Sequence, residues 1–388
     1  MNSTAPTSPH VEGIDELADA IADELRRSPI DLDPVRAVDE RVRQLAPLAS
    51  DRQRRQLTDA VTARLDGLDR LEPLLADPTV DEILVGNGTV WAERCGQIAH
   101  VAAIGDATTR RIIERVLGPL GRRLDRTSPI VDARLPDGAR VCAVVAPVAV
   151  TGPTLSIRRF ADRARSLDEF VASSDAGLAA AADRCRELVA ARCNVVVSGA
   201  TSSGKTSLLA ALLDQADPTE RIVVLEDIAE LPCRSPHLVR LEARPASPDG
   251  PPPITVEQLV RTALRLRPDR LVVGEARGDE VIALIQAMNT GHDGSFSTVH
   301  ANSATDAMLR IEALTVRAAP EWPISAVRQA LASSIDAVVH VERRGGQRVI
   351  VDVAEVDAGA PGDDPTRFDR PLALRPLLAG APLTRRRT

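Results

Sequence analysis

The chain contains one lysine among its 388 residues, and this lysine, Lys205, lies within the segment GATSSGKT at Gly199–Thr206. The segment matches the pattern G-x-x-x-x-G-K-[ST] at every fixed position, and in this pattern backbone N–H groups and a helix N-terminus point toward phosphate oxygens. The other 47 of the 48 basic residues are arginine. Lysine therefore stands where a compact ammonium suits the β- and γ-phosphates better than a planar guanidinium does. The sequence predicts a site for a nucleoside triphosphate.

The residues on both sides of this loop have the composition that a phosphate-binding loop needs. Asn194–Ser198 is a short apolar strand, and Ser207–Leu213 is rich in helix formers. Strand, loop and helix thus follow in the order of a parallel α/β domain, and the Thr206 hydroxyl is placed to bind Mg²⁺. The residues expected to bind nucleotide in this loop are Gly199, Ala200, Thr201, Ser202, Ser203, Gly204, Lys205, Thr206 and Ser207.

Composition limits the classes of protein to which the chain can belong. With 44% hydrophobic residues it can build ordinary cores, and its apolar runs are shorter than the roughly 20 residues that span a bilayer. The start of the chain has no apolar signal-peptide region, so we expect a cytoplasmic protein. A net charge of −7 and few aromatic residues (four Phe, two Trp and no Tyr) make direct binding of nucleic acid an unfavoured function.

The pattern of apolar residues changes along the chain and so predicts separate parts. Ile14, Leu17 and Ile21 repeat at helical spacing, whereas the glycine-flanked segment Gly86–Gly88 joins two short strands as in a hairpin. The last 30 residues hold five prolines. The expected parts are a disordered segment 1–12, a helical extension 13–69, a mixed α/β domain 70–160, a hinge 161–174, a P-loop domain 175–358 and a flexible tail 359–388.

Acidic residues follow two further apolar strands of the expected P-loop domain. Glu226 and Asp227 come after the strand 222–225, and Glu275 comes after the strand 271–273. Because the carboxyl ends of parallel strands meet at one edge of a sheet, these acids and the loop should converge. We expect Glu275 to orient the attacking water, with Glu226 as the alternative, and Glu226 or Asp227 to hold Mg²⁺. Glu226 could instead cap the segment after its strand.

Two of the six histidines lie in a segment of small residues, TGHDGSFSTVHAN at Thr290–Asn302. Gly, Ser and Thr at this density next to a strand indicate close backbone approach to a ligand, or a switch element. We expect His300 to act in the site and to report the nucleotide state. For His292 a functional role and a structural role stay equally open.

Three segments form longer motifs: RLRPDRLVVGEARG at Arg265–Gly278, AMNTGHDG at Ala287–Gly294 and STVHAN at Ser297–Asn302. Together they closely resemble the type II/type IV secretion ATPase family. More narrowly, they look like the branch that drives tight-adherence pilus assembly and is often labelled conjugal-transfer-associated. Upstream, Leu75–Ile83 and Ser128–Val141 resemble the N-terminal domain of that branch, so the resemblance covers about residues 70–345.

The resemblance assigns a role to each motif. Walker B reads Gly274-Glu275 and lacks the aspartate that is usual in P-loop ATPases, as it does in this family, so Glu226 or Asp227 could carry that aspartate's Mg²⁺ role. The four motifs of the family occur in its order, as Walker A at Gly199–Thr206, the aspartate box at Arg221–Leu231, Walker B at Leu271–Gly278 and the histidine box at Thr290–His300.

The same resemblance implies a fold and an activity. The fold is a RecA-like P-loop motor domain of the α/β class, preceded by a small mixed α/β domain and a helical N-terminal extension. The activity is that of a Mg²⁺-dependent ATPase that forms a homohexamer and works with platform proteins at the inner face of the cytoplasmic membrane, to assemble a pilus or drive related secretion. A DNA-translocating conjugation motor and a non-hydrolysing nucleotide-binding scaffold are the alternatives.

Lys205 alone leaves the γ-phosphate of ATP short of cationic partners, so a further arginine is expected at the site. The family resemblance favours arginines of the N-terminal domain, Arg140 and Arg158 first. At a ring interface such an arginine could act on the nucleotide of a neighbouring subunit. The other candidates are Arg134, Arg159, Arg240, Arg265 and Arg277.

Overall fold

The computed structural model of the protein describes residues 9–27, 34–65, 67–94, 96–135, 137–159, 166–171, 178–244, 246, 251–358, 365–378 and 383–384. The chain divides into two compact units, and the boundary between them falls at residues 161 and 162. Each unit has its own β-sheet and its own apolar core.

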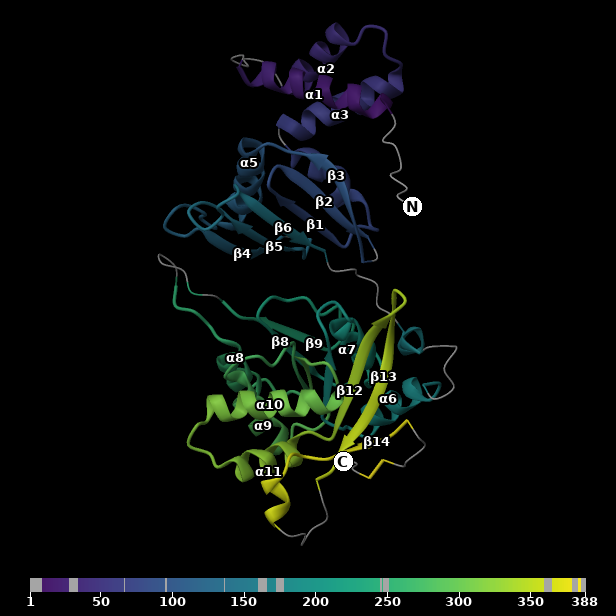
Figure 1. Ribbon diagram of the computed structural model, residues 1–388, viewed down its shortest axis with the longest axis vertical. Coiled ribbons are helices and arrows are strands. Elements are labelled where there is room, and N and C mark those ends of the chain that lie inside the picture. The colour runs from purple at the N-terminus through teal and green to yellow at the C-terminus, as the bar shows by residue number, and fades with distance from the viewer. Residues whose placement is uncertain are drawn as a thin grey trace. The chain divides into compact units, whose positions relative to one another are not determined.

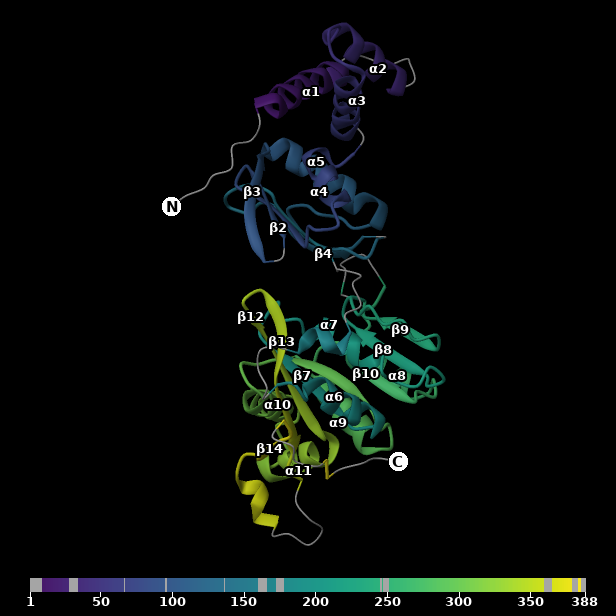
Figure 2. The same ribbon diagram turned by 90° about the vertical axis from the view of Figure 1, so that its right-hand side faces the viewer.

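The first unit begins with three helices, α1 (Pro9–Arg27), α2 (Pro34–Leu45) and α3 (Asp51–Leu65), which Figure 2 shows side by side. Their apolar sides meet in a small core that includes the fully buried Ile21 and Val61. The disorder expected over residues 1–12 is wrong for residues 9–12. These form the start of α1, because proline fits the first turn of a helix. Residues 1–8 lie outside the described residues.

A six-stranded antiparallel sheet follows, with the strand order β3-β2-β1-β6-β5-β4. Alternate residues such as Ile83, Val141 and Ile157 form the core with the helix α5, while the residues between them on β1 and β5 are only partly buried. The elements are η1 (Asp69–Leu71), α4 (Glu72–Ala76), β1 (Glu82–Gly86), β2 (Thr89–Arg94), β3 (Gln97–Ala103), α5 (Asp106–Leu117), η2 (Gly118–Leu120), β4 (Ile130–Arg134), β5 (Arg140–Val144) and β6 (Thr154–Arg158).

The hairpin predicted around Gly86–Gly88 is confirmed, because β1 and β2 pair through a register that closes at Gly86 and Thr89. The two turn residues, Asn87 (φ 49°) and Gly88 (φ 72°), are both left-handed. This is the geometry of the asparagine-glycine turn whose twist matches that of the flanking strands.

The second unit contains an eight-stranded sheet with the order β14-β13-β12-β7-β11-β10-β8-β9. The six strands from β12 to β9 run parallel, and β13 and β14 are antiparallel at one edge (Figure 1). The strands are β7 (Val195–Gly199), β8 (Ile222–Glu226), β9 (Leu238–Glu242), β10 (Arg270–Val273), β11 (Phe296–His300), β12 (Ala337–Arg344), β13 (Gln347–Val356) and β14 (Leu374–Pro376).

Helices cover both faces of this sheet, as expected for the RecA-like P-loop fold (Figures 1 and 2). One face packs against α6 and α7, and the other packs against α8, α9, α10 and α11. The helices are η3 (Leu167–Phe170), α6 (Ala181–Ala190), α7 (Lys205–Leu213), α8 (Val256–Ala263), α9 (Glu280–Asn289), α10 (Ala304–Ala318), α11 (Ile324–Ser334) and η4 (Pro365–Asp369).

Because both faces are covered, the central strands are buried throughout and mostly apolar. Every residue of β7, β8 and β10 is buried. The parallel direction places the carboxyl ends of β7, β8, β10 and β11 at one edge of the sheet, and the loop that begins at Gly199 lies there. This edge carries the predicted acids and His300.

The hinge expected over residues 161–174 is wrong for residues 167–170. These form η3, whose Leu167 and Phe170 are fully buried in the core of the second unit. In the sequence these two apolar side chains stand among polar neighbours, which favour a hinge. Residues 160–165 and 172–177 lie outside the described residues.

The prediction of a flexible tail over residues 359–388 is wrong for residues 365–378. Within this segment η4 precedes β14, which pairs with Ala354–Val356 of β13, and Leu377 is buried in the core. Arg375 also forms an ion pair with the buried Glu355. The prolines predicted a flexible segment. The structure instead buries Leu377, which lies between two of them, in the apolar core of the second unit. In the part of the chain that the structure describes, no helix is both long and apolar enough to cross a bilayer.

We expect Leu377→Ala to lower the free energy of unfolding by about 2–4 kcal/mol, because the leucine is buried and its loss leaves a cavity. Denaturant unfolding of the full chain measures this change. The matched control is Leu309→Ala on α10, where the leucine is 42% exposed and the cost should be well below that of Leu377→Ala. Equal effects of the two substitutions would show that the segment 365–378 does not belong to the core.

Candidate nucleotide site

The loop between β7 and α7 contains glycine where steric contacts exclude any side chain. A Cβ atom at Gly199 would collide with the Ser203 hydroxyl and the Val341 carbonyl. Gly204 has a φ of +104°, and a Cβ atom there would lie 2.5 Å from Cδ of Arg348. Helix α7 begins directly after Gly204, so its first N–H groups have no partner within the helix and face the loop. Both glycines of the phosphate-binding pattern are therefore structurally necessary.

The Lys205 side chain is folded back into this loop and is only 8% exposed. Its ammonium donates to the carbonyl oxygens of Gly199 (3.1 Å) and Ala200 (2.9 Å), and it lies 3.2 Å from Nδ1 of His300. The positive charge is thus held at the end of β7, beside the first N–H groups of α7. This arrangement concentrates positive potential where the sequence predicts phosphate.

His300 connects the lysine to Glu275. Its Nδ1 faces the Lys205 ammonium, and its Nε2 lies 3.3 Å from Oε1 of Glu275. Burial first, and then the charge of Lys205, lower the pKa of His300 below its usual value, against the opposing effect of Glu275. The imidazole is therefore neutral at pH 7, and because the ammonium can only donate, Nδ1 accepts and Nε2–H donates to the carboxylate.

Glu226 lies on the adjacent strand β8 and is only 5% exposed. Its Oε1 accepts the backbone N–H groups of Glu230 (2.9 Å) and Leu231 (2.8 Å), so the cap considered for this residue exists. Its Oε2 is buried and has no hydrogen-bond partner within the described ranges. Burial raises the pKa of Glu226. Gly274 leaves room for this side chain, because a Cβ atom there would lie 2.9 Å from Cγ of Glu226.

The orphaned Oε2 of Glu226 fits a hydrated Mg²⁺ ion. An unsatisfied buried carboxylate oxygen costs about 1–3 kcal/mol, so a ligand or its water is the natural partner. Mg²⁺ takes one or two carboxylates together with phosphate oxygens and keeps several waters. Such a site does not need a cluster of protein ligands, and among the described residues no group of three or more His, Cys, Asp or Glu could hold a metal. The residues that would hold Mg²⁺ are Thr206 and Glu226.

Asp227 has a different partner. Its carboxylate pairs with the guanidinium of Arg277, which lies within the Walker B motif, and both side chains are about half exposed. The carbonyl of Arg277 in turn accepts from Arg317 on α10 (3.1 Å). Asp227 and Arg277, both named as candidates from sequence, are therefore joined to each other. The metal role of Asp227 stays a prediction.

His292 lies at the opposite end of β11 from His300. Its Nδ1 is 3.2 Å from the Ala287 carbonyl, and its own carbonyl accepts from the Ser295 hydroxyl (2.7 Å). Since β11 runs parallel to β7, this turn lies at the amino edge of the sheet and the loop lies at the carboxyl edge. Of the two roles left open for His292, the structural one agrees with this position.

The first unit places three of the candidate arginines in one row. Arg134 on β4 pairs in register with Arg140 on β5, which pairs with Arg158 on β6. Residues directly opposite one another share a face of the sheet, and like charges there are unfavourable unless an anion is nearby. Asp132 lies 3.9 Å from Arg140. Glu82 of β1 stands opposite Arg158 in the same row. The role of the three arginines at the nucleotide stays a prediction.

Two groups near the loop had no signal in the sequence. The hydroxyl of Ser198, directly before Gly199, lies 2.8 Å from Nδ1 of the buried His340 on β12. Arg348 on β13 donates to the Ser207 hydroxyl at 3.0 Å. Neither β12 nor β13 is near the loop in sequence, so only the pairing of β12 with β7 brings these residues there.

Comparison with known proteins agrees with this geometry. The family described as Type II/IV secretion system protein matches residues 64–351, close to the extent expected from sequence. A Mycobacterium tuberculosis protein whose name places it in conjugal transfer is 41% identical over 300 residues, which cover 75% of this chain and 84% of that protein. The conjugal transfer protein TrbB of Rhizobium radiobacter is 33% identical over 294 residues, with coverage of 74% and 87%.

A solved structure supports the fold independently. The X-ray structure of the ATPase DotB from Legionella pneumophila is 19% identical and superposes with a TM-score of 0.52, over 78% of this chain and 85% of that chain. The family match spans both units and contains the loop, the two acids and His300. The chain belongs to the type II/IV secretion system protein family, whose RecA-like fold it has.

Proposed function

We propose that this protein is a Mg²⁺-dependent ATP-hydrolysing motor that powers assembly of a tight-adherence-type pilus, or related secretion, at the inner face of the cytoplasmic membrane. Its family and its structural neighbours are secretion ATPases, which supports ATPase activity in general. The observation that carries the proposal is the chain of contacts from Lys205 through His300 to Glu275, beside the orphaned oxygen of Glu226.

In this proposal the loop residues Gly199–Ser207 bind the phosphates of ATP, and Lys205 neutralises charge between the β- and γ-phosphates. Bound Mg²⁺ would supply a second positive charge against the same oxygens. Glu275 orients the attacking water, because it is 32% exposed and water reaches it, whereas Glu226 is almost completely buried. His300 holds the Glu275 carboxylate through Nε2–H and so ties its orientation to Lys205.

We also propose a homohexamer in which Arg140 and Arg158 complete the nucleotide site. The phosphate transition state needs more positive charge than one lysine gives, and the arginine row of the first unit offers it. Platform proteins at the membrane are the proposed partners.

A conjugation motor that moves DNA is the second candidate, and the names of two relatives favour it. The net charge of −7 and the lack of tyrosine favour the secretion motor, because strand contact needs basic and aromatic surfaces. The third candidate is a scaffold that binds nucleotide without hydrolysis. The contacts of His300 with Lys205 and with Glu275 count against it.

We expect Glu275→Gln to bind ATP and to lower turnover by at least about 100-fold, because the amide keeps the shape but cannot accept a proton. Phosphate release and retained ATP on the purified protein measure the two effects. The control is Glu257→Gln on α8, which should hydrolyse like the wild type. If Glu226→Gln traps ATP while Glu275→Gln turns over normally, the two acids have been assigned in the wrong order.

The same phosphate-release assay separates the candidate functions. Turnover by the wild type contradicts the scaffold, and its absence contradicts the ATPase. Duplex DNA added to the wild type should leave turnover unchanged, whereas strong stimulation would favour the conjugation motor.

We expect the turnover of the wild type to fall once the pH drops below the usual histidine range, because His300 then becomes protonated. The pKa of His300 is lowered, so the neutral form persists to a pH below the usual histidine range, and the imidazolium that then forms faces the Lys205 charge. His300→Asn keeps an acceptor for the lysine without a titrating group. In this variant the fall in turnover at low pH should begin at a lower pH than in the wild type. In the control, His292→Asn, it should begin at the same pH as in the wild type. If turnover of His300→Asn falls at the same pH as that of the wild type, His300 is not the group whose protonation lowers turnover.

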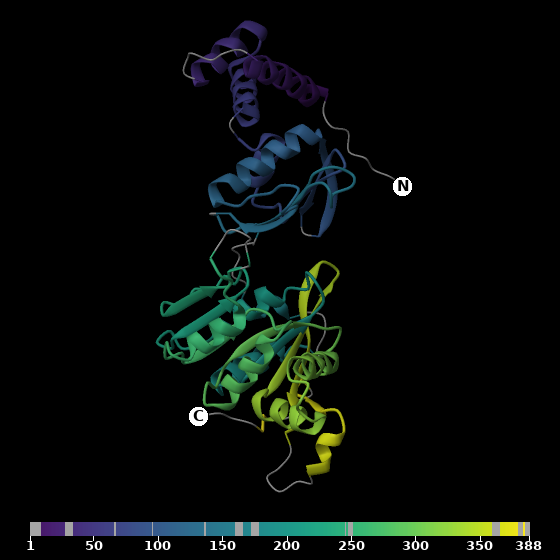
Figure 3. The ribbon, with the colours of Figure 1, turned by 90° about the vertical axis from the view of Figure 1, so that its left-hand side faces the viewer.

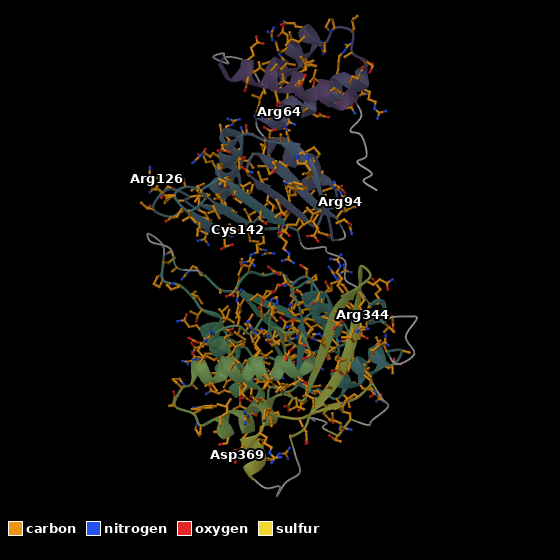
Figure 4. The ribbon with its side chains drawn as sticks, in the orientation of Figure 1. Arg64, Arg94, Arg126, Cys142, Arg344 and Asp369 are labelled. Carbon is orange, nitrogen blue, oxygen red and sulfur yellow. The ribbon has the colours of Figure 1, made fainter. Side chains whose placement is uncertain are left out.

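We expect Arg158→Ala to lower turnover by at least about tenfold with ATP binding largely kept. Arg126→Ala is the control, because Arg126 is an exposed arginine of the same unit outside the row (Figure 4). Mixing Arg158→Ala with Glu275→Gln should restore part of the activity if the arginine acts on a neighbour's site. Full activity of a demonstrably monomeric wild type would refute the shared site.

A further inference from the structure

The hairpin of β12 and β13 extends past the carboxyl edge of the sheet beside the phosphate-binding loop. Residues Ala337–His340 of β12 pair with β7, and β12 then continues to Arg344 while β7 ends at Gly199. The carbonyl of Val341 lies against Gly199, so the extension begins at the first residue of the loop. Figure 3 shows the yellow hairpin reaching beyond the other strands, and Figure 4 labels Arg344 on it.

The returning strand β13 brings Arg348 onto the loop. The methylene groups of its side chain pack on Gly204, because a Cβ atom at this glycine would lie 2.5 Å from Cδ and 3.1 Å from Cγ of Arg348. Its Nη1 donates to the Ser207 hydroxyl at 3.0 Å. The guanidinium is thus fixed at the first turn of α7, next to the N–H groups that end the loop. Arg348 is therefore a second cation, besides Lys205, that lies at the predicted phosphate site.

The loop also contains a buried polar group, the Ser203 hydroxyl, whose hydrogen-bonding capacity is unsatisfied among the described residues. The hydroxyl of Ser203 is buried, with the residue 3% exposed, and it has no hydrogen-bond partner in the part of the chain that the structure describes. It lies with the Val341 carbonyl against Gly199, on the β12 side of the loop. An unsatisfied buried hydroxyl is costly, so its presence indicates that a polar ligand approaches this side as well.

The order of the strands sets the direction in which a nucleotide lies. β7 has β11 on one side and β12 on the other. His300 and Glu275, which act on the terminal phosphate in the proposed function, lie on the β11 side, and Arg348 lies on the β12 side. In the proposed function the β-phosphate lies over the loop itself, so a nucleotide whose terminal phosphate meets His300 and Glu275 has its α-phosphate toward the β12–β13 hairpin.

We propose that Arg348 binds the α-phosphate of the nucleotide, with Ser207 as its partner at the start of α7. The inference rests on the proposed nucleotide site and adds to it a residue from a distant strand. A guanidinium that is already fixed by a hydroxyl and by packing on Gly204 loses little freedom when it binds phosphate. Both ADP and ATP carry the α-phosphate, so Arg348 supports both states equally, whereas the residues on the β11 side distinguish them.

The test is equilibrium binding of ADP and of a non-hydrolysable ATP analogue to the full chain, by calorimetry at one salt and Mg²⁺ concentration. We expect Arg348→Gln to raise the Kd of both nucleotides by about tenfold or more, because a charge-assisted hydrogen bond to phosphate is lost. Arg348→Lys, which keeps the stem and the charge, should bind within about threefold of the wild type. The control, Arg344→Gln on the same hairpin, should bind like the wild type.

Each outcome decides between the inference and its rivals. A wild-type Kd for ADP in Arg348→Gln overturns the α-phosphate role, and a loss confined to the ATP analogue places Arg348 at the γ-phosphate instead. If Arg348→Lys, which keeps the stem and the charge, binds as weakly as Arg348→Gln, a positive charge at this position does not support nucleotide binding, and the inference is wrong. Thermal unfolding without nucleotide identifies a variant that is merely unstable, and Arg348→Lys then decides. Failure of the wild type to bind any nucleotide would overturn the proposed function itself.

Discussion

The position of the Lys205 ammonium is the interaction on which the arrangement of the site depends. The side chain is nearly buried, and two carbonyl oxygens at the end of β7 together with the His300 ring hold it in place. Through His300 the charge reaches Glu275 beyond β10, so one cation links three neighbouring parallel strands. An arginine could not occupy this place, because a planar guanidinium does not fit between two carbonyls of a tight loop.

Burial on both faces of the sheet keeps these groups in register. The apolar strands β7, β8 and β10 have no freedom to slip, since a shift by one residue would reverse every side chain. Glu226 is a buried acid at the end of β8, where one carboxylate oxygen accepts from the backbone of the following turn and the other has no partner among the described residues. The unsatisfied oxygen destabilises the ligand-free protein, and a ligand that satisfies it stabilises the bound form.

The strands at the other edge extend the site away from the acids. The buried Glu355 at the base of β13 forms an ion pair with Arg375 of β14 and accepts the backbone N–H of Thr384 (2.9 Å). The segment near the carboxyl terminus therefore supports the strand that carries Arg348. A part of the chain that looks dispensable in sequence is structurally connected to the phosphate-binding loop.

Much of the motor domain could be predicted without coordinates, because its information is local. The pattern G-x-x-x-x-G-K-[ST], the apolar strands and the acids that follow them are contiguous in sequence. The rule that parallel strands end at one edge predicted that Glu226, Glu275 and the loop converge, and the small residues around His300 indicated its role. Sequence alone left the role of His292 open, since that depends on the direction of β11 in the sheet. It also gave no sign that Arg348 meets Gly204 and Ser207, or that Leu377 completes the core. These contacts join residues more than 100 positions apart or cover an apolar surface that exists only once the sheet has formed, and such contacts are decided by tertiary packing.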